Sequence, residues 1–262
     1  MISVKNITKK YGDFTAVDSI SFEVKKGEVF AFLGPNGAGK TTTIKMLTTL
    51  TRPTSGEVLL DRHDVTKNPS DTRKSFGIVF QDPSLDNELT AYENMYFHAV
   101  LYDIPKELAK ERISKLLELV ELSNKKDQYV KTFSGGMKRR LEIARGLLHQ
   151  PKVLFLDEPT LGLDPQTRKH IWSYIKNLNE KEKVTVFFTT HHMDEVERMA
   201  ERVAIIDHGK IVTIGTIEEI KQKTGMQNLE DAFISLTGQE IREEEGNAGK
   251  FQMAVNRKLN MG

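Results

Sequence analysis

The feature that most constrains this chain is a glycine-rich segment, Gly34-Pro-Asn-Gly-Ala-Gly39-Lys40-Thr41, which is a complete G-x-x-x-x-G-K-[ST] pattern. A continuous apolar run, Val29–Leu33, precedes it, and a helix-like stretch from Thr41 to Leu50 follows it. Glycines let a backbone wrap closely enough for its N–H groups to point at phosphate oxygens. The helix adds its positive N-terminal end. The segment therefore predicts a phosphate-binding loop between a buried strand and a helix.

Two side chains of this loop have expected roles of their own. Lys40 would neutralise the β- and γ-phosphates of a bound nucleotide, and the hydroxyl of Thr41 would ligate Mg²⁺. We therefore expect the phosphates of a nucleotide, together with Mg²⁺, as the bound species. The residues expected to hold the nucleotide here are Gly34, Pro35, Asn36, Gly37, Ala38, Gly39, Lys40, Thr41 and Thr42.

A second apolar run, Val153–Leu156, ends in two carboxylates, Asp157 and Glu158. The carboxyl ends of parallel strands form the edge of the sheet where α/β proteins bind ligands. Asp157 is expected to hold Mg²⁺, usually through water, and Glu158 to orient and deprotonate the attacking water. Strands often end in acidic residues simply at solvent, so the phosphate loop is what favours this interpretation.

The pattern of apolar residues predicts the fold class. Runs at Val153–Leu156, Val184–Phe188 and Val203–Ile206 are separated by helical stretches, which is typical of βα units and a mostly parallel sheet. Short alternating segments before residue 60 predict an N-terminal antiparallel β portion. Amphipathic helical patterns at about residues 85–150 predict an inserted helical subdomain. We expect an α/β fold with a P-loop NTPase core over residues 1–238, followed by a mobile tail over 239–262.

Composition limits the class of protein. The chain has 38 Lys and Arg against 37 Asp and Glu, a formal net charge of +1, so no overall field steers it onto nucleic acid, and we expect no nucleic-acid partner. There is no cysteine for a disulfide framework or a thiolate metal site. No apolar run approaches the roughly 20 residues that span a bilayer. We expect a soluble, cytoplasmic protein that meets a membrane only through a partner.

The segment Phe133-Ser-Gly-Gly-Met137 opens another predicted helix, with Ser134 as a natural N-cap. Gly135 and Gly136 weaken a helix start, but they also expose N–H groups that an anion could use. A phosphate loop, then this Ser-Gly-Gly start, then an Asp-Glu strand end resembles the nucleotide-binding domain of ABC ATPases over residues 1–238. One departure is Met137, which stands where the family usually has Gln.

The resemblance implies roles for further residues. Tyr11 corresponds to the aromatic residue that stacks on adenine, and Gln81 to the glutamine that approaches Mg²⁺ and water and senses the membrane partner. His191 corresponds to the switch histidine that contacts the γ-phosphate; His192 is adjacent, and counting from the Thr-Thr pair favours His191. Leu163-Asp164 is similar to the segment that crosses between two subunits.

The resemblance also implies the function. It indicates an ATP-binding and ATP-hydrolysing subunit that powers an ABC membrane transporter, peripheral on the inner face of the cell membrane. Its partners would be an integral-membrane permease and, on ATP binding, a second copy or a similar ATPase chain. Each ATP would then lie between one phosphate loop and Ser134–Gly136 of the other subunit. Segments such as Gln81–Asp86 and Leu229–Ile234 look most like ABC-2 exporters of drugs and polysaccharides.

Two other classes remain open at this level. A soluble ABC-type ATPase could serve translation or DNA repair without a membrane partner, although such proteins generally carry two domains in one chain or a long coiled coil. A nucleotide-binding regulator without turnover is the other class, and Glu158 and His191 argue against it.

Overall fold

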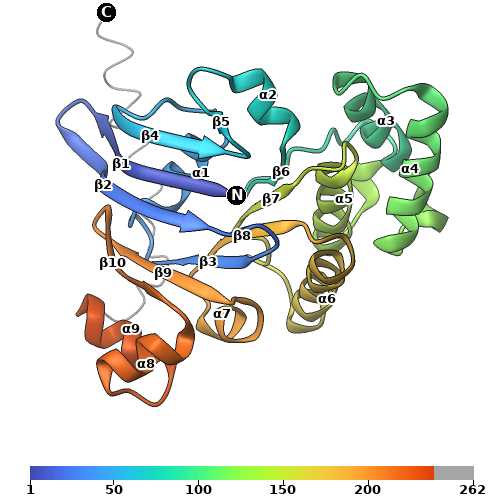
Figure 1. Ribbon diagram of the computed structural model, residues 1–262. Helices are drawn as coiled ribbons and strands as arrows, with labels where there is room; N and C mark the ends of the chain where they lie inside the picture. Colours follow the sequence, from blue (N-terminus) through green and yellow to red (C-terminus); the bar gives the residue numbers. More distant parts are fainter. Residues whose placement is uncertain (239–262) are drawn as a thin grey trace, which may run out of the picture.

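The computed structural model describes residues 1–238, so the mobile tail predicted for residues 239–262 lies outside the described part. Two sheets form the body of the molecule (Figure 1). The four-stranded sheet has the order β2-β1-β4-β5 and is antiparallel. The six-stranded sheet has the order β10-β9-β3-β8-β7-β6, in which only the edge pair β10–β9 is antiparallel. The predicted fold class is confirmed.

The bounds of the elements follow the expected alternation of strands and helices. The strands are β1 (Ile2–Tyr11), β2 (Phe14–Val24), β3 (Val29–Leu33), β4 (Ser55–Leu60), β5 (His63–Asp64), β6 (Phe76–Val79), β7 (Val153–Asp157), β8 (Thr185–Thr190), β9 (Arg202–Asp207) and β10 (Lys210–Gly215). The helices are α1 (Lys40–Leu47), α2 (Pro69–Lys74), α3 (Ala91–Leu101), α4 (Lys106–Leu119), α5 (Gly135–Leu147), α6 (Pro165–Glu182), α7 (Met193–Met199), α8 (Ile217–Thr224) and α9 (Leu229–Thr237). Short 3-10 turns lie at Ser123–Lys125 and Val130–Thr132.

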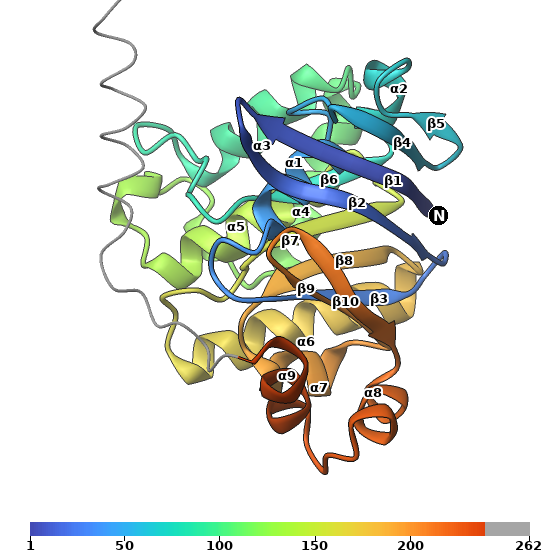
Figure 2. The same cartoon turned by 90° about the vertical axis from the view of Figure 1, so that its left-hand side faces the viewer.

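The parallel sheet is buried on both faces, as its continuous apolar strands predict. Along β3, Val29, Ala31 and Leu33 pack with α6, α7 and α9 in one hydrophobic cluster. Phe30 and Phe32 point to the opposite cluster, with α1 and the four-stranded sheet. Figures 1 and 2 show the four-stranded sheet on one side of the parallel strands and α6 and α7 on the other. Alternation along a single strand thus builds two cores.

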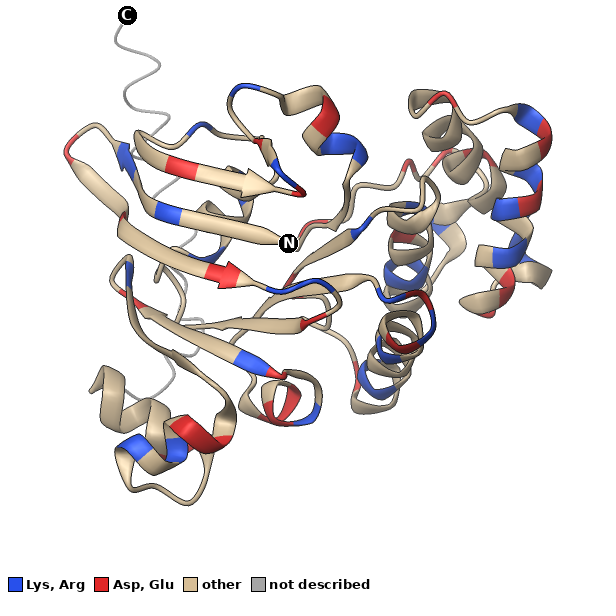
Figure 3. Cartoon of the chain, viewed as in Figure 1, with Lys and Arg blue, Asp and Glu red and all other residues tan. Residues whose placement is uncertain are grey.

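Helices α3, α4 and α5 form a third hydrophobic cluster at one side of the sheets, where Figure 1 draws α3 and α4 in green and α5 in yellow-green. They fall within residues 85–150, the range predicted for an inserted helical subdomain. Helix α5 also packs against β6, where an added Cβ at Gly77 would lie only 2.1 Å from the carbonyl oxygen of Gly146. Charges of both signs mix along the outer helices (Figure 3). Within residues 1–238, no helix is both long and apolar enough to cross a membrane.

The first helix ends earlier than the sequence pattern predicts. Helix α1 stops at Leu47 rather than Leu50, because Thr49 adopts a left-handed conformation with φ of 63°. The N–H of Leu50 then bonds to the carbonyl of Lys45 at 2.9 Å. This is the Schellman arrangement that closes many helices, and it turns the side chain of Leu50 out to solvent.

Candidate functional site

The glycine-rich loop has the close-packed geometry that the sequence predicts. Gly39 caps α1 with φ of 106°, and an added Cβ there would lie 2.7 Å from the carbonyl oxygen of Ala16. At Gly34, an added Cβ would lie 2.4 Å from the carbonyl oxygen of Ile206. Both positions therefore require glycine. The loop leads from the end of β3 to the N-terminus of α1, where free N–H groups and the helix dipole favour an anion.

Lys40 is the buried cation of this loop. Its Nζ donates to the carbonyl oxygens of Gly34 at 2.8 Å and Pro35 at 3.2 Å. It also forms an ion pair with Oε1 of Glu158 at 3.2 Å. Burial lowers the pKa of Lys40, and the negative charges of Glu158 and Asp157 oppose that shift. The loop thus holds one positive charge directly in front of the two carboxylates.

Asp157 ends β7 within reach of Thr41. The hydroxyl of Thr41 lies 3.4 Å from Oδ1 of Asp157, at the long limit for a hydrogen bond. Oδ1 also accepts a hydrogen bond from the hydroxyl of Thr189 at 2.6 Å. Burial raises the pKa of the Asp157 carboxyl, and the hydrogen bonds from Thr189 and Thr41 partly offset that rise. The Thr41 hydroxyl and the Asp157 carboxylate, on separate elements, therefore place two possible oxygen ligands for a metal ion next to each other.

Glu158 lies between two partners, Lys40 and His191. Nδ1 of His191 is 3.0 Å from Oε2 of Glu158, and since a carboxylate only accepts, Nδ1 carries the hydrogen. Burial opposes the charge on Glu158, but the hydrogen bond from His191 and the charge of Lys40 outweigh it and lower its pKa to about 2. The ring of His192 lies against that of His191, with ring centroids 4.2 Å apart, but its Nε2 has no hydrogen-bond partner. Its main-chain N–H bonds to the hydroxyl of Thr190.

The structure thus brings together Lys40, Thr41, Asp157, Glu158 and His191, which the sequence places far apart. Other predicted site residues lie outside this cluster. Gln81 is exposed. Its main-chain oxygen accepts a hydrogen bond from the guanidinium of Arg139 at 3.1 Å. Tyr11 ends β1 with its side chain 49% exposed and the Nζ of Lys9 5.0 Å from its ring centre.

The predicted Ser134–Gly136 segment also lies apart from the phosphate loop of its own chain. The hydroxyl of Ser134 accepts a bond from the N–H of Met137 at 3.3 Å and caps α5, as predicted. A Cβ at Gly136 would lie 2.6 Å from the methyl of Thr167, so the start of α5 packs against the start of α6. That leaves the first N–H groups of α5 without partners from residues 34–42.

Helix α5 is tied to the loop that contains Gln81 (residues 80–84, the Gln81 loop) by a buried ion pair that the sequence does not predict. Nη1 of Arg139 lies 3.1 Å from Oε2 of Glu142 and donates to the carbonyl of Phe80. Glu142 in turn accepts from the N–H of Ser84 at 2.7 Å. The only signal was an Arg and a Glu three residues apart, which usually form a solvated pair on a helix surface. Here both side chains are buried and tie α5 to residues 80–84.

The carboxylate of Glu195 is a second buried group that the sequence does not predict. It joins the segment that follows Glu158 to the segment that precedes His191. The carboxylate of Glu195, at the start of α7 and 3% exposed, accepts hydrogen bonds from the hydroxyls of Thr160 and Thr190. Such charged groups are rarely buried without partners. Polar residues ending the apolar run Val184–Phe188 were the available signal, but nothing in the sequence shows which groups meet them.

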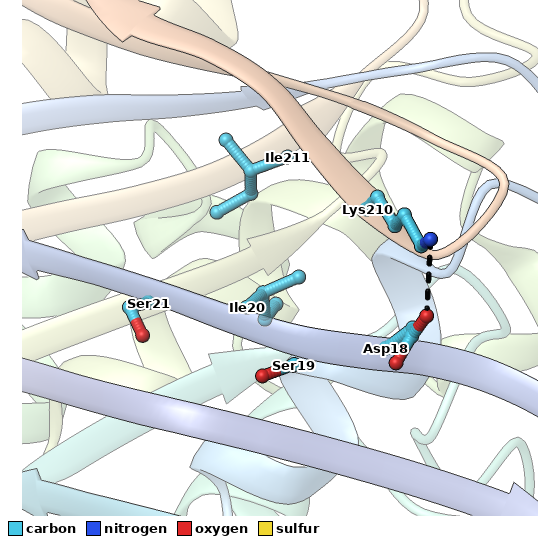
Figure 4. Close-up of a pocket in the computed structure, with 6 residues that line it drawn as sticks. All are labelled: Asp18, Ser19, Ile20, Ser21, Lys210 and Ile211. Carbon is cyan, nitrogen blue, oxygen red and sulfur yellow. Dashed lines mark ion pairs between the residues drawn. The ribbon is translucent and has the colours of Figure 1, made fainter.

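A hollow of about 450 Å³ lies between the edge strands β2 and β10 (Figure 4). Asp18 and Lys210 face each other across it, with an ion pair of 3.3 Å. None of the predicted site residues lines this hollow. It therefore belongs to the junction of the two sheets rather than to the cluster around Glu158.

The sequence and the structure of this chain are similar to those of several known proteins. The family described as ABC transporter matches residues 17–161. The linearmycin resistance ATP-binding protein LnrL of Bacillus subtilis is 42% identical over 243 residues, covering 93% of this chain and 76% of that protein. The doxorubicin resistance ATP-binding protein DrrA of Mycobacterium tuberculosis is 37% identical, covering 92% and 72%. A solved dimer of the ATP-binding cassette MJ0796, bound to ADP and Pi after hydrolysis, aligns with a TM-score of 0.74 at 30% identity, covering 82% of this chain and 98% of that one.

Proposed function

This chain belongs to the ABC transporter family of ATP-binding proteins, and we propose that it powers export through an integral-membrane partner by hydrolysing ATP at the Glu158 cluster. The membership makes the chain an ATPase that drives a membrane transporter. The names of these two relatives concern resistance to linearmycin and doxorubicin, which supports outward transport. An amphipathic, drug-like compound is the substrate class that these names favour.

The geometry supports separate roles for the residues around the γ-phosphate. The phosphate loop and α1 bind the phosphates, and Lys40 exchanges Glu158 for phosphate oxygens when ATP binds. Loss of that ion pair raises the pKa of Glu158 above its value of about 2 and makes it a better base. Glu158 takes a proton from water, the water oxygen bonds to the γ-phosphorus, and the bond to the bridging oxygen of ADP breaks. His191 holds Glu158 in place, and it would contact the same phosphate.

The donor set near Asp157 fits Mg²⁺. This ion takes hard oxygen ligands, usually one or two from the protein, and keeps several waters. The Thr41 hydroxyl and the Asp157 carboxylate supply such oxygens on adjacent elements. Within residues 1–238 there is no group of three or more His, Cys, Asp or Glu side chains that could hold a metal ion. Phosphate oxygens of the nucleotide and water would supply the remaining ligands. When bound, Mg²⁺ would neutralise charge on the phosphates.

A second ATPase subunit completes the site in this proposal. Ser134–Gly136 offers N–H groups at the start of α5, and it packs against Leu163 and Thr167 of its own chain. Two chains facing each other head to tail would place this segment of one chain against the ATP of the other. The dimeric state of the solved MJ0796 cassette supports the pairing of two chains. A homodimer and a pairing with a similar chain satisfy it equally well.

The membrane partner would dock beside the Gln81 loop, on the cytoplasmic face of the membrane. Phe97, Val100 and Leu101 lie at i, i+3 and i+4 on α3, with exposed fractions of 55%, 54% and 79%. We call these three residues the α3 patch. An apolar patch on a helix suits a short amphipathic helix of a permease. Arg139 and Glu142 connect the same region to α5, so ATP binding and partner binding would affect each other.

The single observation that carries the proposal is the convergence of Lys40, Asp157, Glu158 and His191 at the mouth of the phosphate loop. The test combines phosphate release by the purified chain with recovery of the full-length chain from membranes. Turnover that is lost in Lys40→Ala, together with co-purification of a polytopic membrane protein, supports it. Turnover without membrane association favours a soluble ABC-type ATPase, and nucleotide binding without turnover favours a regulator.

A further inference from the structure

Thr189 occupies an unusual place at the end of the apolar strand β8. It is fully buried, and in the parallel ladder it lies directly beside Asp157 of β7. The residues before it, Val186 to Phe188, are apolar and equally buried. A hydroxyl in such surroundings must find hydrogen-bond partners, because an unpaired buried polar group is costly. Its hydrogen-bond partners are Asp157 and Glu158, the two residues to which the proposed function gives roles at the reacting phosphate.

The Thr189 hydroxyl contacts two consecutive residues in different ways. Its O–H donates to Oδ1 of Asp157 at 2.6 Å. The same oxygen accepts from the main-chain N–H of Glu158 at 3.0 Å. A hydroxyl has a single proton, so donation to Asp157 leaves a lone pair for Glu158. One side chain therefore restrains both the carboxylate expected to hold Mg²⁺ and the backbone that carries the base.

The backbone at Glu158 needs such a restraint. Its φ is 46°, in the left-handed region that residues other than glycine rarely adopt. The N–H of Glu158 bonds both to the hydroxyl of Thr189 and, at 3.2 Å, to its main-chain oxygen. This turn aims the side chain of Glu158 at Lys40 and His191. Strained conformations at sites of chemistry persist where surrounding contacts hold them.

We propose that Thr189 is a positioning residue for ATP hydrolysis, whose single hydroxyl orients Asp157 toward Mg²⁺ and holds Glu158 in its turn toward the attacking water. The inference rests on the proposed function of Asp157 and Glu158. A purely structural role would satisfy the same hydrogen bonds, but it would not couple the hydroxyl to Mg²⁺ dependence. The experiment separates these two roles.

Thr189→Val removes the hydroxyl and keeps the branched shape, while Thr189→Ser keeps the hydroxyl. The matched control is Thr185→Val in the same strand: Thr185 is equally buried, and its hydroxyl accepts from the N–H of Gly27 at 2.9 Å, away from the site. We expect Thr189→Val to lower kcat by about 10–100-fold, the usual effect of removing a group that orients a metal ligand. The KM for ATP should rise by no more than the gain in affinity that Mg²⁺ provides, because binding by the phosphate loop itself is intact.

A second readout does not depend on turnover. Calorimetric titration of ATP with Mg²⁺ and with EDTA gives the gain in affinity that Mg²⁺ provides. Thr189→Val should lose most of that gain, Thr189→Ser should keep it, and Thr185→Val should keep both the gain and kcat. If Thr189→Val does not fold, Thr189→Ser and Thr189→Ala replace the pair, since they differ by the hydroxyl alone.

The outcomes are distinct. A wild-type chain without turnover contradicts the proposed function itself. Normal turnover in wild type with near-normal kcat and Mg²⁺ gain in Thr189→Val overturns only the inference about Thr189. Equal losses in Thr189→Val and Thr185→Val, or no rescue by Thr189→Ser, also overturn it, because the effect then comes from packing in β8.

Discussion

Nζ of Lys40 lies 3.2 Å from Oε1 of Glu158, and both side chains are buried. The lysine that should meet the γ-phosphate is therefore paired with the carboxylate that should act as the base. In the proposed mechanism, ATP displaces Glu158 from Lys40 before the site reacts. The same exchange frees the carboxylate, so nucleotide binding and activation of the base are one event in this geometry.

Glu158→Gln should separate binding from turnover. Hydrolysis should fall by roughly 10²–10⁴-fold, the usual contribution of a positioned base. ATP affinity should rise, because the neutral amide no longer competes for Lys40, and the ATP-bound dimer should accumulate. Phosphate release, calorimetry and light scattering measure these three effects, with exposed Glu57→Gln as the control. Near-normal turnover in Glu158→Gln would remove Glu158 from the role of base.

Tyr11→Ala should weaken nucleotide binding by about 1–3 kcal/mol if the exposed ring stacks on adenine, whereas Tyr11→Trp should largely preserve it. Discrimination between ATP and GTP should be modest, because stacking tolerates any base. Phe14→Ala is the matched control, since Phe14 pairs with Tyr11 across the hairpin and is also exposed. Calorimetric titration of the three variants decides the question. Equal affinities for wild type and Tyr11→Ala would show that Tyr11 does not contact the base.

Local patterns account for most of what the sequence predicts correctly. The phosphate loop depends on residues that are adjacent in the chain, and the buried strands β3, β7 and β8 appear as continuous apolar runs. The contacts that position the chemistry are not local. Thr189 and Asp157 are 32 positions apart and become neighbours only through the pairing of β7 with β8. Side-chain partners across a sheet depend on register, which no periodicity in one strand reveals.

His98 on α3 should make stability depend on pH. Burial lowers its pKa to about 3, and the charges of Arg145 and His149 add to the shift. Since the ordinary pKa is near 6.5, the unfolded chain binds more protons below that pH, so the free energy of unfolding falls as pH drops from about 6.5 toward 3. Urea unfolding at several pH values should show a shallower decline for His98→Phe than for wild type. An exposed control on α6, His170→Phe, should decline in parallel with wild type.

One result would contradict the prediction for His98. If His98→Phe and wild type lose stability in parallel across that pH range, then the imidazole of His98 is not kept neutral by the fold. The neighbouring ring of His149, with centroids 6.0 Å apart and a pKa also lowered by burial, would then be the next group to replace.

Charge on the α3 patch should uncouple transport from the ATPase. Leu101→Glu and Phe97→Glu place a carboxylate on exposed positions, so the fold and basal turnover should remain while an apolar partner helix is repelled. Val212→Glu on β10, also partly exposed and at the opposite side of the molecule in Figure 1, is the control. The measurements are ATP turnover of each purified variant and recovery of the membrane chain by the same variant. Wild-type recovery by both α3 variants would place the docking surface elsewhere, whereas loss of recovery with intact turnover, absent in Val212→Glu, is the expected result.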